Sequence, residues 1–498
     1  ERDTVLLLAP YNQRGDRDLT VAAMGGAGLT HDGGGYLRSA STQRSGYVTL
    51  VDVAPTVLAT LGLDRPASME GRPFEFTGSD TDRVGRVDEM ISGNAASRFR
   101  ENLLVPTTML IVLALGGVCA LAIACLAGPR PPAWVRHGVA TVALAAMLAV
   151  PTSFLARAFP LEEHGLGFYW SFLIGVSLAL AVVLATVALR LDRPRAAVIG
   201  ALIVVLAVPA YDVMNGSQLA LSAAFGYSPT GNSRLYGISN YALGAFGASA
   251  CLLAGILASR RDDRRHKLAA VALMVSALAV IGVPVWGANV GGILSFAPVV
   301  ALFVALVSGR RVRLGRWAVA LGVVTLIAVG GFAALDLARP AEERAHLGRL
   351  MERIGDEGIG VLWGFVQRKG LAAIEVSFTS FWSIGLVIAV IFLLYLRREP
   401  GRPLDRARSH MPQLRTGLLA AYAAATFGSM ANDSGTIVGA TAMLVVASSV
   451  IWMTLVSEHP AAAGPRPADP APASPVPASA VPAGSAPDRP ADGPADAR

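Results

Sequence analysis

The sequence predicts a mainly α protein, a polytopic membrane helix bundle that follows a short segment of strand and helix. Hydrophobic residues make up 53% of the 498 residues and charged residues only 15%. The mean hydropathy is +0.52, well above that of an average water-soluble globular chain. About eleven apolar stretches lie between Leu103 and Leu455, and most approach the roughly 20 residues that a helix needs to cross a bilayer.

The apolar stretches set the expected order of the spans. We expect them at residues 103–127, 138–157, 168–189, 196–213, 240–258, 268–285, 290–307, 316–335, 377–396, 416–430 and 436–456. The stretch at 416–430 is short, so it and the last span are expected to form a helical hairpin with a tip below the outer surface. Residues 336–378 are too polar to be one span, and the helical spacing of their first half predicts an amphipathic helix at the interface.

Arginine-rich and arginine-poor connections alternate along the chain. The arginine-rich ones are residues 128–137, 190–195, 259–267, 308–316 and 396–415. By the positive-inside rule these connections face the cytoplasm. The connections expected to face outward are residues 215–240, 286–290, 336–378 and 431–435. We therefore expect a multi-pass protein of the cytoplasmic membrane. Because topology explains the net charge of +7, nucleic acid is not an expected partner.

The chain divides into three regions by composition. Residues 1–95 form an extracytoplasmic segment, residues 100–457 the transmembrane domain, and residues 458–498 a Pro/Ala-rich cytoplasmic tail that is expected to be disordered. The chain begins at Glu1 without an initiator methionine. We therefore expect a missing amino-terminal part, with a signal peptide or an upstream span.

The amino-terminal segment has the pattern of the last part of a larger α/β domain. The apolar residues 4–9 predict a buried strand, and residues 51–61 predict a helix. Asp52 lies near the start of that helix and Gly62 just past its end, which are favoured positions for these residue types. Glycine clusters lie between the strand and the helix.

The segment also carries motifs of a known superfamily. Residues 34–48 are followed by Asp-x-x-Pro-Thr at Asp52 to Thr56 and by Pro-x-x-x-x-Gly at Pro66 to Gly71. These motifs resemble the carboxy-terminal end of alkaline-phosphatase-superfamily domains, the sulfatase-like and phosphopentomutase-like enzymes. The resemblance implies a partial α/β domain of that type over about 70 residues.

The resemblance also implies a chemistry. Such enzymes hold two metal ions with Asp and His and use a Ser or Thr nucleophile from their amino-terminal half. Here Ala9 and Pro10 stand where that family commonly has an Asp-His pair, and His31 with Asp32 is the weak candidate for a ligand pair. Activity as a metal-dependent phospho- or sulfo-ester hydrolase or transferase would need residues missing from this chain. No cofactor is evident, and a divalent metal is expected only if the missing half supplies ligands.

The outward connections hold clusters of Gly, Asn, Asp, Ser and Arg. Such clusters are costly at membrane depth unless they line a cavity, pair with each other or bind a polar ligand. Guanidinium groups bind phosphate bidentately, and Asp with His can do acid–base work. We therefore expect a polar headgroup site formed by Arg234, Asn240, Asn289, His346, Arg349, Asn432 and Asp433. The alternative is that these units only turn the chain between spans and pair structurally.

Three motifs in these connections carry a second resemblance. They are Tyr-Gly-Ile-x-Asn at Tyr236 to Asn240, Gly-Ala-Asn-Val-Gly-Gly at Gly287 to Gly292, and Asn-Asp-Ser-Gly at Asn432 to Gly435. With the amino-terminal segment they resemble a group of uncharacterised bacterial multi-span membrane proteins that have a sulfatase-like external domain. This resemblance implies a fold and a location and no established reaction.

Three functions are open at this point. The first is a cell-envelope protein that handles a phosphorylated or lipid-linked glycan precursor at the outer face of the membrane. The second is a transporter or flippase with a polar cavity that opens outward, because glycine-rich interrupted spans suit discontinuous helices. The third is a scaffold with an inactive phosphatase-like domain. The lipid bilayer is a partner in all three.

Overall fold

The chain is almost entirely helical. A computed structural model describes residues 3–9, 18–26, 34–66, 69, 71–129, 131–232, 234–259, 263–309, 314–398 and 413–456. Helices hold 73% of the described residues and strands 5%. Two units are distinguished, residues 1–458 and residues 459–498. The tail predicted to be disordered lies outside the described residues.

The predicted apolar stretches are all helical. The helices are α2 (Arg83–Ala127), α3 (Ala133–Leu155), α4 (Leu161–Arg190), α5 (Arg195–Met214), α6 (Asn240–Ser259), α7 (Arg264–Gly282), α8 (Val290–Val307), α9 (Leu314–Leu337), α10 (His346–Glu357), α11 (Val361–Thr379), α12 (Trp382–Arg398), α14 (Leu414–Ala431) and α15 (Thr436–Leu455). Among the described residues, nine helices are long and apolar enough to cross a membrane. The pair α11–α12, bent by 74°, would be a tenth span. The protein is therefore a multi-pass membrane protein, and the number eleven stays a prediction.

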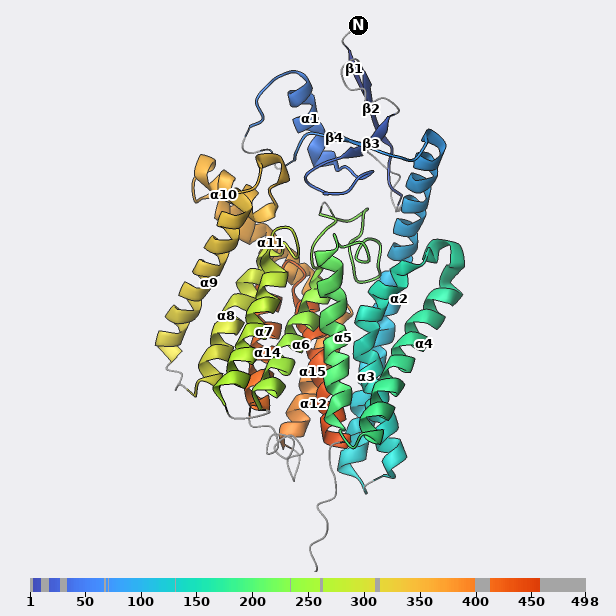
Figure 1. The fold of residues 1–498 in the computed structure, drawn as a ribbon, viewed down its shortest axis with the longest axis vertical. Coiled ribbons are helices and arrows are strands. Elements are labelled where there is room, and N and C mark those ends of the chain that lie inside the picture. Colours follow the sequence, from blue (N-terminus) through green and yellow to red (C-terminus); the bar gives the residue numbers. More distant parts are fainter. Residues whose placement is uncertain are drawn as a thin grey trace, which may run out of the picture. The chain divides into compact units, whose positions relative to one another are not determined.

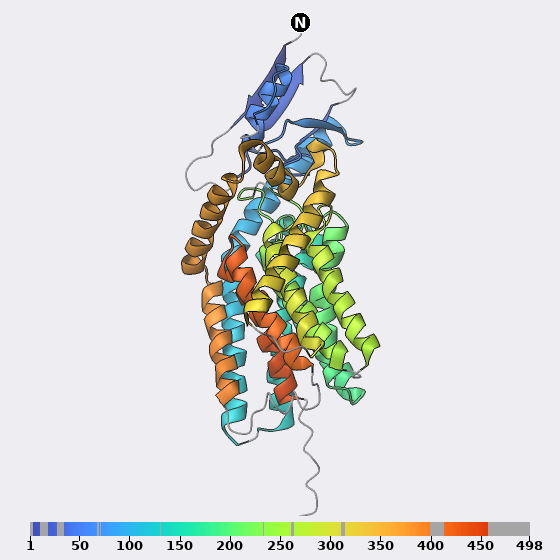
Figure 2. The same ribbon diagram turned by 90° about the vertical axis from the view of Figure 1, so that its left-hand side faces the viewer.

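Helix α15 forms the centre of the bundle. Its residues from Ile437 to Leu455 are all buried, and it packs against α3, α6, α12 and α14 (Figures 1 and 2). Small residues let these helices approach closely, as is common in membranes. A Cβ on Gly255 of α6 would lie 2.8 Å from the Cα of Gly417 in α14. The bundle below the outer connections is therefore tightly filled.

The amino-terminal segment is built from two antiparallel strand pairs and one short helix. Strand β1 (Thr4–Leu8) pairs with β2 (Ala22–Gly26), and β3 (Gly35–Arg38) pairs with β4 (Glu75–Gly78). The turn η1 (Leu50–Asp52) leads into α1 (Val53–Thr60). The predicted strand and helix are confirmed. An α/β domain of the alkaline-phosphatase type stays a prediction, because every strand pair among the described residues is antiparallel.

The predicted burial of the first strand is wrong. Val5 is 66% exposed and Leu7 is 61% exposed. Strand β1 has β2 as its neighbour in a two-stranded sheet, and such a ribbon buries little apolar surface by itself. An apolar run of five residues shows that a strand is favoured and does not show that a second layer covers it.

The amino-terminal segment is attached to the helical part in two ways. Helix α2 begins at Arg83, inside the range expected for the segment, and runs for 45 residues into the first span. The buried guanidinium of Arg44 donates from Nε to the Leu235 carbonyl at 3.0 Å and from Nη2 to the carbonyl of Ser217. The segment is therefore bound to the loop between α5 and α6.

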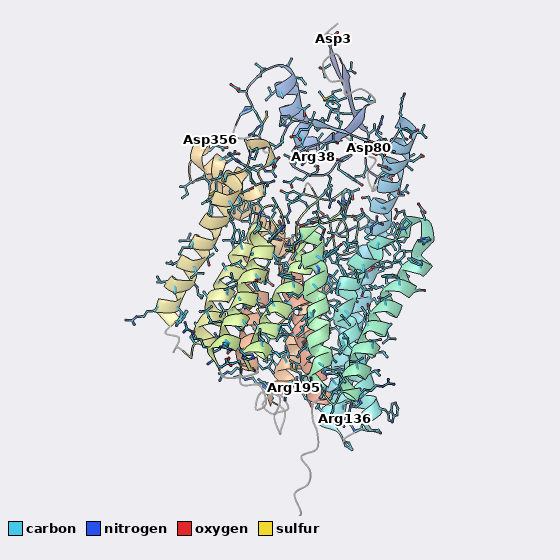
Figure 3. All side chains as sticks on the ribbon, in the orientation of Figure 1. Asp3, Arg38, Asp80, Arg136, Arg195 and Asp356 are labelled. Atoms are coloured by element: carbon cyan, nitrogen blue, oxygen red, sulfur yellow. The ribbon has the colours of Figure 1, made fainter. Side chains whose placement is uncertain are left out.

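Basic and polar connections lie at opposite ends of the bundle. Arg136 and Arg195 lie at one end, whereas Arg38, Asp80 and Asp356 lie at the other (Figure 3). This separation is what alternating connections require of helices that cross in opposite directions. The assignment of the arginine end to the cytoplasm stays a prediction.

Candidate functional site

A large polar cavity lies at the end of the bundle opposite Arg136 and Arg195. Its volume is about 1070 Å³. The cavity is lined by the amino-terminal segment, α2, the α5–α6 loop, the starts of α6 and α8, helices α10 and α11, and the turn between α14 and α15. All seven residues of the expected headgroup site line it: Arg234, Asn240, Asn289, His346, Arg349, Asn432 and Asp433. The structure thus brings together four connections that are far apart in the sequence.

The floor of the cavity is a network of amide and carboxylate groups. Asn240 Nδ2 donates to Asp433 Oδ1 at 3.0 Å and to the Ser434 hydroxyl at 2.6 Å. Asn289 Nδ2 donates to Asn240 Oδ1 at 3.1 Å. Asn432 Nδ2 caps the end of α14 by donating to the Gly428 carbonyl at 3.0 Å. Part of the alternative interpretation is therefore correct, because these asparagines have structural partners.

Glycines allow the three motifs of the outer connections to pack together. Gly237 has a φ of +88°, and a Cβ there would lie 2.2 Å from the Gly287 carbonyl oxygen. A Cβ on Gly291 would lie 2.3 Å from Asn432 Oδ1. Asn289 caps α8 by accepting from the Gly292 N–H at 2.7 Å. A glycine is needed at each close approach because any side chain would push the backbones apart.

Among the described residues, the guanidinium of Arg234 forms hydrogen bonds only with neutral groups. It donates from Nη2 to the Tyr227 hydroxyl at 2.9 Å and from Nη1 to the Ala288 carbonyl. Its guanidinium also lies over the rings of Tyr227 and Tyr236. Desolvation by burial raises the pKa of Tyr227 to about 12, so this phenol stays protonated at neutral pH. The charge of Arg234 is held in place without a carboxylate partner in contact.

Arg349, like Arg234, forms hydrogen bonds only with neutral groups among the described residues. It lies on α10, and its hydrogen bonds run to the Ala345 carbonyl and to the Ser41 hydroxyl, both at 3.4 Å. Helix α10 is fixed at its start by the buried carboxylate of Asp336, which accepts from the N–H groups of Ala345 at 2.9 Å and Gly348 at 2.7 Å. A carboxylate at a helix start satisfies otherwise unpaired N–H groups. Asp336 thereby positions His346 and Arg349 at the cavity.

Two ion pairs at the cavity were not predicted from the sequence. Lys369 of α11 donates to Asp433 Oδ2, and Arg72 of the amino-terminal segment donates to Glu352 Oε2 at 2.9 Å. One signal existed, since Lys267 and Lys369 are the only lysines in the chain. No sequence pattern connects Arg72 with Glu352, because only the fold brings residues so far apart in the chain into contact.

The cations around the cavity lower the pKa values of three neighbouring groups. Burial alone would raise the pKa of Asp433, but Lys369, Arg234 and the Asn240 amide more than offset it, so the pKa is lowered. Burial alone would also raise the pKa of Glu352, but hydrogen bonds and charge from Arg344 and Arg72 more than offset it, so this pKa is lowered too. Desolvation, followed by the charges of Arg349, Lys369 and Arg234, lowers the pKa of His346 to about 3. The carboxylates are therefore ionised and the imidazole is neutral near pH 7.

Among the residues that the structure describes, basic side chains outnumber acidic ones around the cavity. Eight basic residues line it, namely Arg65, Arg72, Arg100, Arg234, Arg349, Arg353, Arg368 and Lys369. Four acidic residues line it, namely Glu101, Glu352, Asp356 and Asp433. Like charges gathered in a concave site raise the local potential and attract a ligand of the opposite sign. The arrangement suits an anion.

The motif of the amino-terminal segment has structural roles. The buried Asp52 accepts from the Ser41 hydroxyl at 2.6 Å, from the Arg72 N–H at 2.9 Å and from the Thr49 hydroxyl at 2.7 Å. Thr56 Oγ1 accepts from the Phe74 N–H at 2.9 Å. These bonds close the fold of the segment and hold Ser41 and Arg72 beside the cavity.

Neither the candidate metal ligands His31 and Asp32 nor the family resemblance gains support. Within the described part of the chain, no group of three or more His, Cys, Asp or Glu side chains could hold a metal ion. His31 and Asp32 lie outside the described residues. No family model, no curated protein and no solved structure matches this chain.

Proposed function

We propose that this protein is an integral membrane protein of the cell envelope that binds a phosphorylated or lipid-linked glycan precursor in this cavity. The observation that carries the proposal is the pair Arg234 and Arg349, two guanidinium groups that line the cavity and contact only neutral partners among the described residues. Guanidinium is the side chain best suited to bidentate binding of phosphate. By the positive-inside rule the cavity opens at the outer face of the cytoplasmic membrane.

The neighbouring groups suit the rest of such a ligand. The neutral imidazole of His346 can accept or donate a hydrogen bond, and the amides of Asn240 and Asn289 lie within the same cavity. Sugars are bound through hydroxyl contacts to groups of this kind. The cavity is also large enough for a ligand of several rings, since small-molecule sites commonly occupy 300 to 1,000 Å³.

A binding assay with purified protein tests the proposal. Glucose 1-phosphate is the probe, and the expected result is binding that weakens about tenfold or more in Arg234→Gln and in Arg349→Gln, because each loses a charge-assisted hydrogen bond. Arg38→Gln is the matched control, since Arg38 lies at the same end and does not line the cavity. Equal binding by all four proteins, or none by the wild type, contradicts the proposal. Envelope glycopolymer content in cells that carry the same variants gives an independent readout.

The transporter is the second candidate, and a specific observation favours it. The chain breaks between α11 and α12 with a bend of 74°, and it breaks again at residues 432–435 between α14 and α15. Discontinuous helices of this kind form the binding sites of many transporters. Below the cavity, however, the buried α15 fills the bundle, which favours binding over passage. Uptake of labelled glucose 1-phosphate into proteoliposomes would support the transporter.

A further inference from the structure

An apolar groove lies beside the polar cavity. It is formed by α8, α9 and α14, which lie near one another in Figure 2, and its volume is about 310 Å³. Its walls are Leu294, Pro298, Leu321, Gly322, Thr325, Phe427, Met430 and Ala431. Helices α8 and α9 are apolar enough to cross a membrane, and only 6% of the apolar stretch of α9 is buried inside the protein. In a membrane the groove would therefore face hydrocarbon.

The groove and the cavity meet on two helices. On α14, Ala431 belongs to the groove and the next residue, Asn432, belongs to the cavity. On α8, Gly291 lines the cavity and Leu294 lines the groove, a separation of about one helical turn. The polar cavity and the apolar groove are thus lined by adjacent residues at the end of α14 and by residues one turn apart at the start of α8.

We propose that the ligand is a lipid phosphate, with its headgroup in the cavity and its hydrocarbon chain in the groove between α9 and α14. The inference rests on the proposed function, because it takes the cavity as the phosphate site. An amphiphile is the one class of ligand that occupies both surfaces at once, and the join at Ala431 and Asn432 sets the length between its phosphate and its first buried methylenes. The chain enters sideways from the bilayer, so the headgroup need not leave the membrane surface.

Photochemical labelling in bilayer vesicles locates the chain. The probe is hexadecyl phosphate with a diazirine in the middle of its chain, and the control is the uncharged alcohol with the same chain. We expect the phosphate to label Leu294, Leu321 and Phe427, with the labelling removed by excess hexadecyl phosphate. We expect the alcohol to label the lipid-facing helices without preference, because lipid tails and free alkyl chains pack on them equally well.

Two glycines of α9 provide a matched pair of variants. A Cβ on Gly322 or on Gly331 would meet nothing within 4 Å, so the backbone at both positions leaves room for a side chain to begin. Gly322 lines the groove, and Gly331 points the opposite way, because nine residues turn a helix by about two and a half turns. Gly322→Phe is expected to weaken binding of hexadecyl phosphate about tenfold by overfilling the groove. Gly331→Phe should leave it unchanged.

Inorganic phosphate separates this inference from the proposed function. Inorganic phosphate that binds the wild type and Gly322→Phe equally, together with an alkyl phosphate that loses affinity only in Gly322→Phe, supports the lipid phosphate. Equal affinities of both probes for wild type and Gly322→Phe would show that the cavity takes a soluble anion. Equal groove labelling by phosphate and alcohol would show ordinary annular lipid. If neither phosphate binds at all, the proposed function itself fails.

Discussion

The two walls of the cavity are held in different ways. The inner wall consists of the ends of α6 and α8 and the turn before α15, where glycines bring backbones into contact. The outer wall consists of α10 and α11, and α11 has no buried residue. The outer wall is held by hydrogen bonds and ion pairs, such as Asp336 to the start of α10 and Lys369 to Asp433, and by a small apolar cluster that includes Leu347 of α10. The inner wall is therefore fixed by backbone packing along its length, whereas the outer wall depends on a few separate contacts.

This difference fits a site that must both hold a phosphate and admit a bulky ligand. Closely packed backbones fix the amide groups of Asn240 and Asn289 with little freedom. Regions with few buried apolar contacts open at lower free energy than the core. We expect α10 and α11 to move when a ligand enters, and we expect the inner wall to stay in place.

The largest expected effect is a glycine substitution on the inner wall. Gly237→Ala places a Cβ 2.2 Å from the Gly287 carbonyl oxygen at a backbone φ of +88°. We expect the free energy of unfolding to fall by about 3 kcal/mol, from left-handed strain and overpacking together. Thermal unfolding in detergent measures it.

The matched control lies on the outer wall. A Cβ on Gly364 of α11 meets nothing within 4 Å, so Gly364→Ala is expected to be neutral or to stabilise by up to about 1 kcal/mol through helix propensity. Equal losses in the two variants would contradict the contrast between the walls.

The second effect concerns the attachment of α10. Asp336→Ala leaves the N–H groups of Ala345 and Gly348 without their carboxylate, and we expect a loss of about 2 kcal/mol. Asp336→Asn keeps one acceptor oxygen and should cost about half as much. Glu357→Gln, at an exposed ion pair near the other end of α10, should stay within about 0.5 kcal/mol of the wild type. A small loss in Asp336→Ala would show that α10 is held by something else.

Local pattern predicted the elements and the polar residues of the site. Apolar length located the helices of the expected spans, helical spacing of polar residues indicated α10, and the sequence did not predict α11 as a helix. The polar connections gave the seven residues expected at the cavity. Asn432 and Asp433 could be found because a polar group between two apolar stretches is costly unless it has a purpose. Such signals are properties of a few neighbouring residues, so they survive without knowledge of the fold.

The partners of those residues could not be predicted in the same way. Arg72 meets Glu352, Arg44 meets Leu235 and Lys369 meets Asp433 only because of how the helices and the amino-terminal segment pack. Helical and strand periodicity show which face of an element is apolar, and they do not show which element will cover it. The exposed β1 illustrates the same limit, since its apolar sequence was correct for a strand and wrong for a buried one.

The smallest expected effect is a pH dependence at His346 of the outer wall. The pKa of His346 in the folded protein, about 3, lies below the ordinary value of 6.5. Between these two pH values the imidazole is protonated in the unfolded chain and neutral in the folded protein. The folded protein is therefore most stable above pH 6.5, and its free energy of unfolding decreases as the pH falls from 6.5 toward 3. His346 is partly accessible and lines the cavity, where water screens the charges, so the effect should be a modest fall in the unfolding temperature.

His346→Gln removes this titration, so its unfolding temperature should depend less on pH between 6.5 and 4 than that of the wild type. His164→Gln is the matched control, an exposed histidine in α4 that does not line the cavity. An identical pH profile for His346→Gln and the wild type would show that neither desolvation nor the charges of Arg349, Lys369 and Arg234 lower the pKa of the imidazole. A bound phosphate would neutralise the same cations and raise the pKa of His346, so the acid sensitivity should shrink when hexadecyl phosphate is present. The glycine contacts of the inner wall carry no titratable group, so this response to the ligand should arise from the imidazole of His346 and not from those contacts.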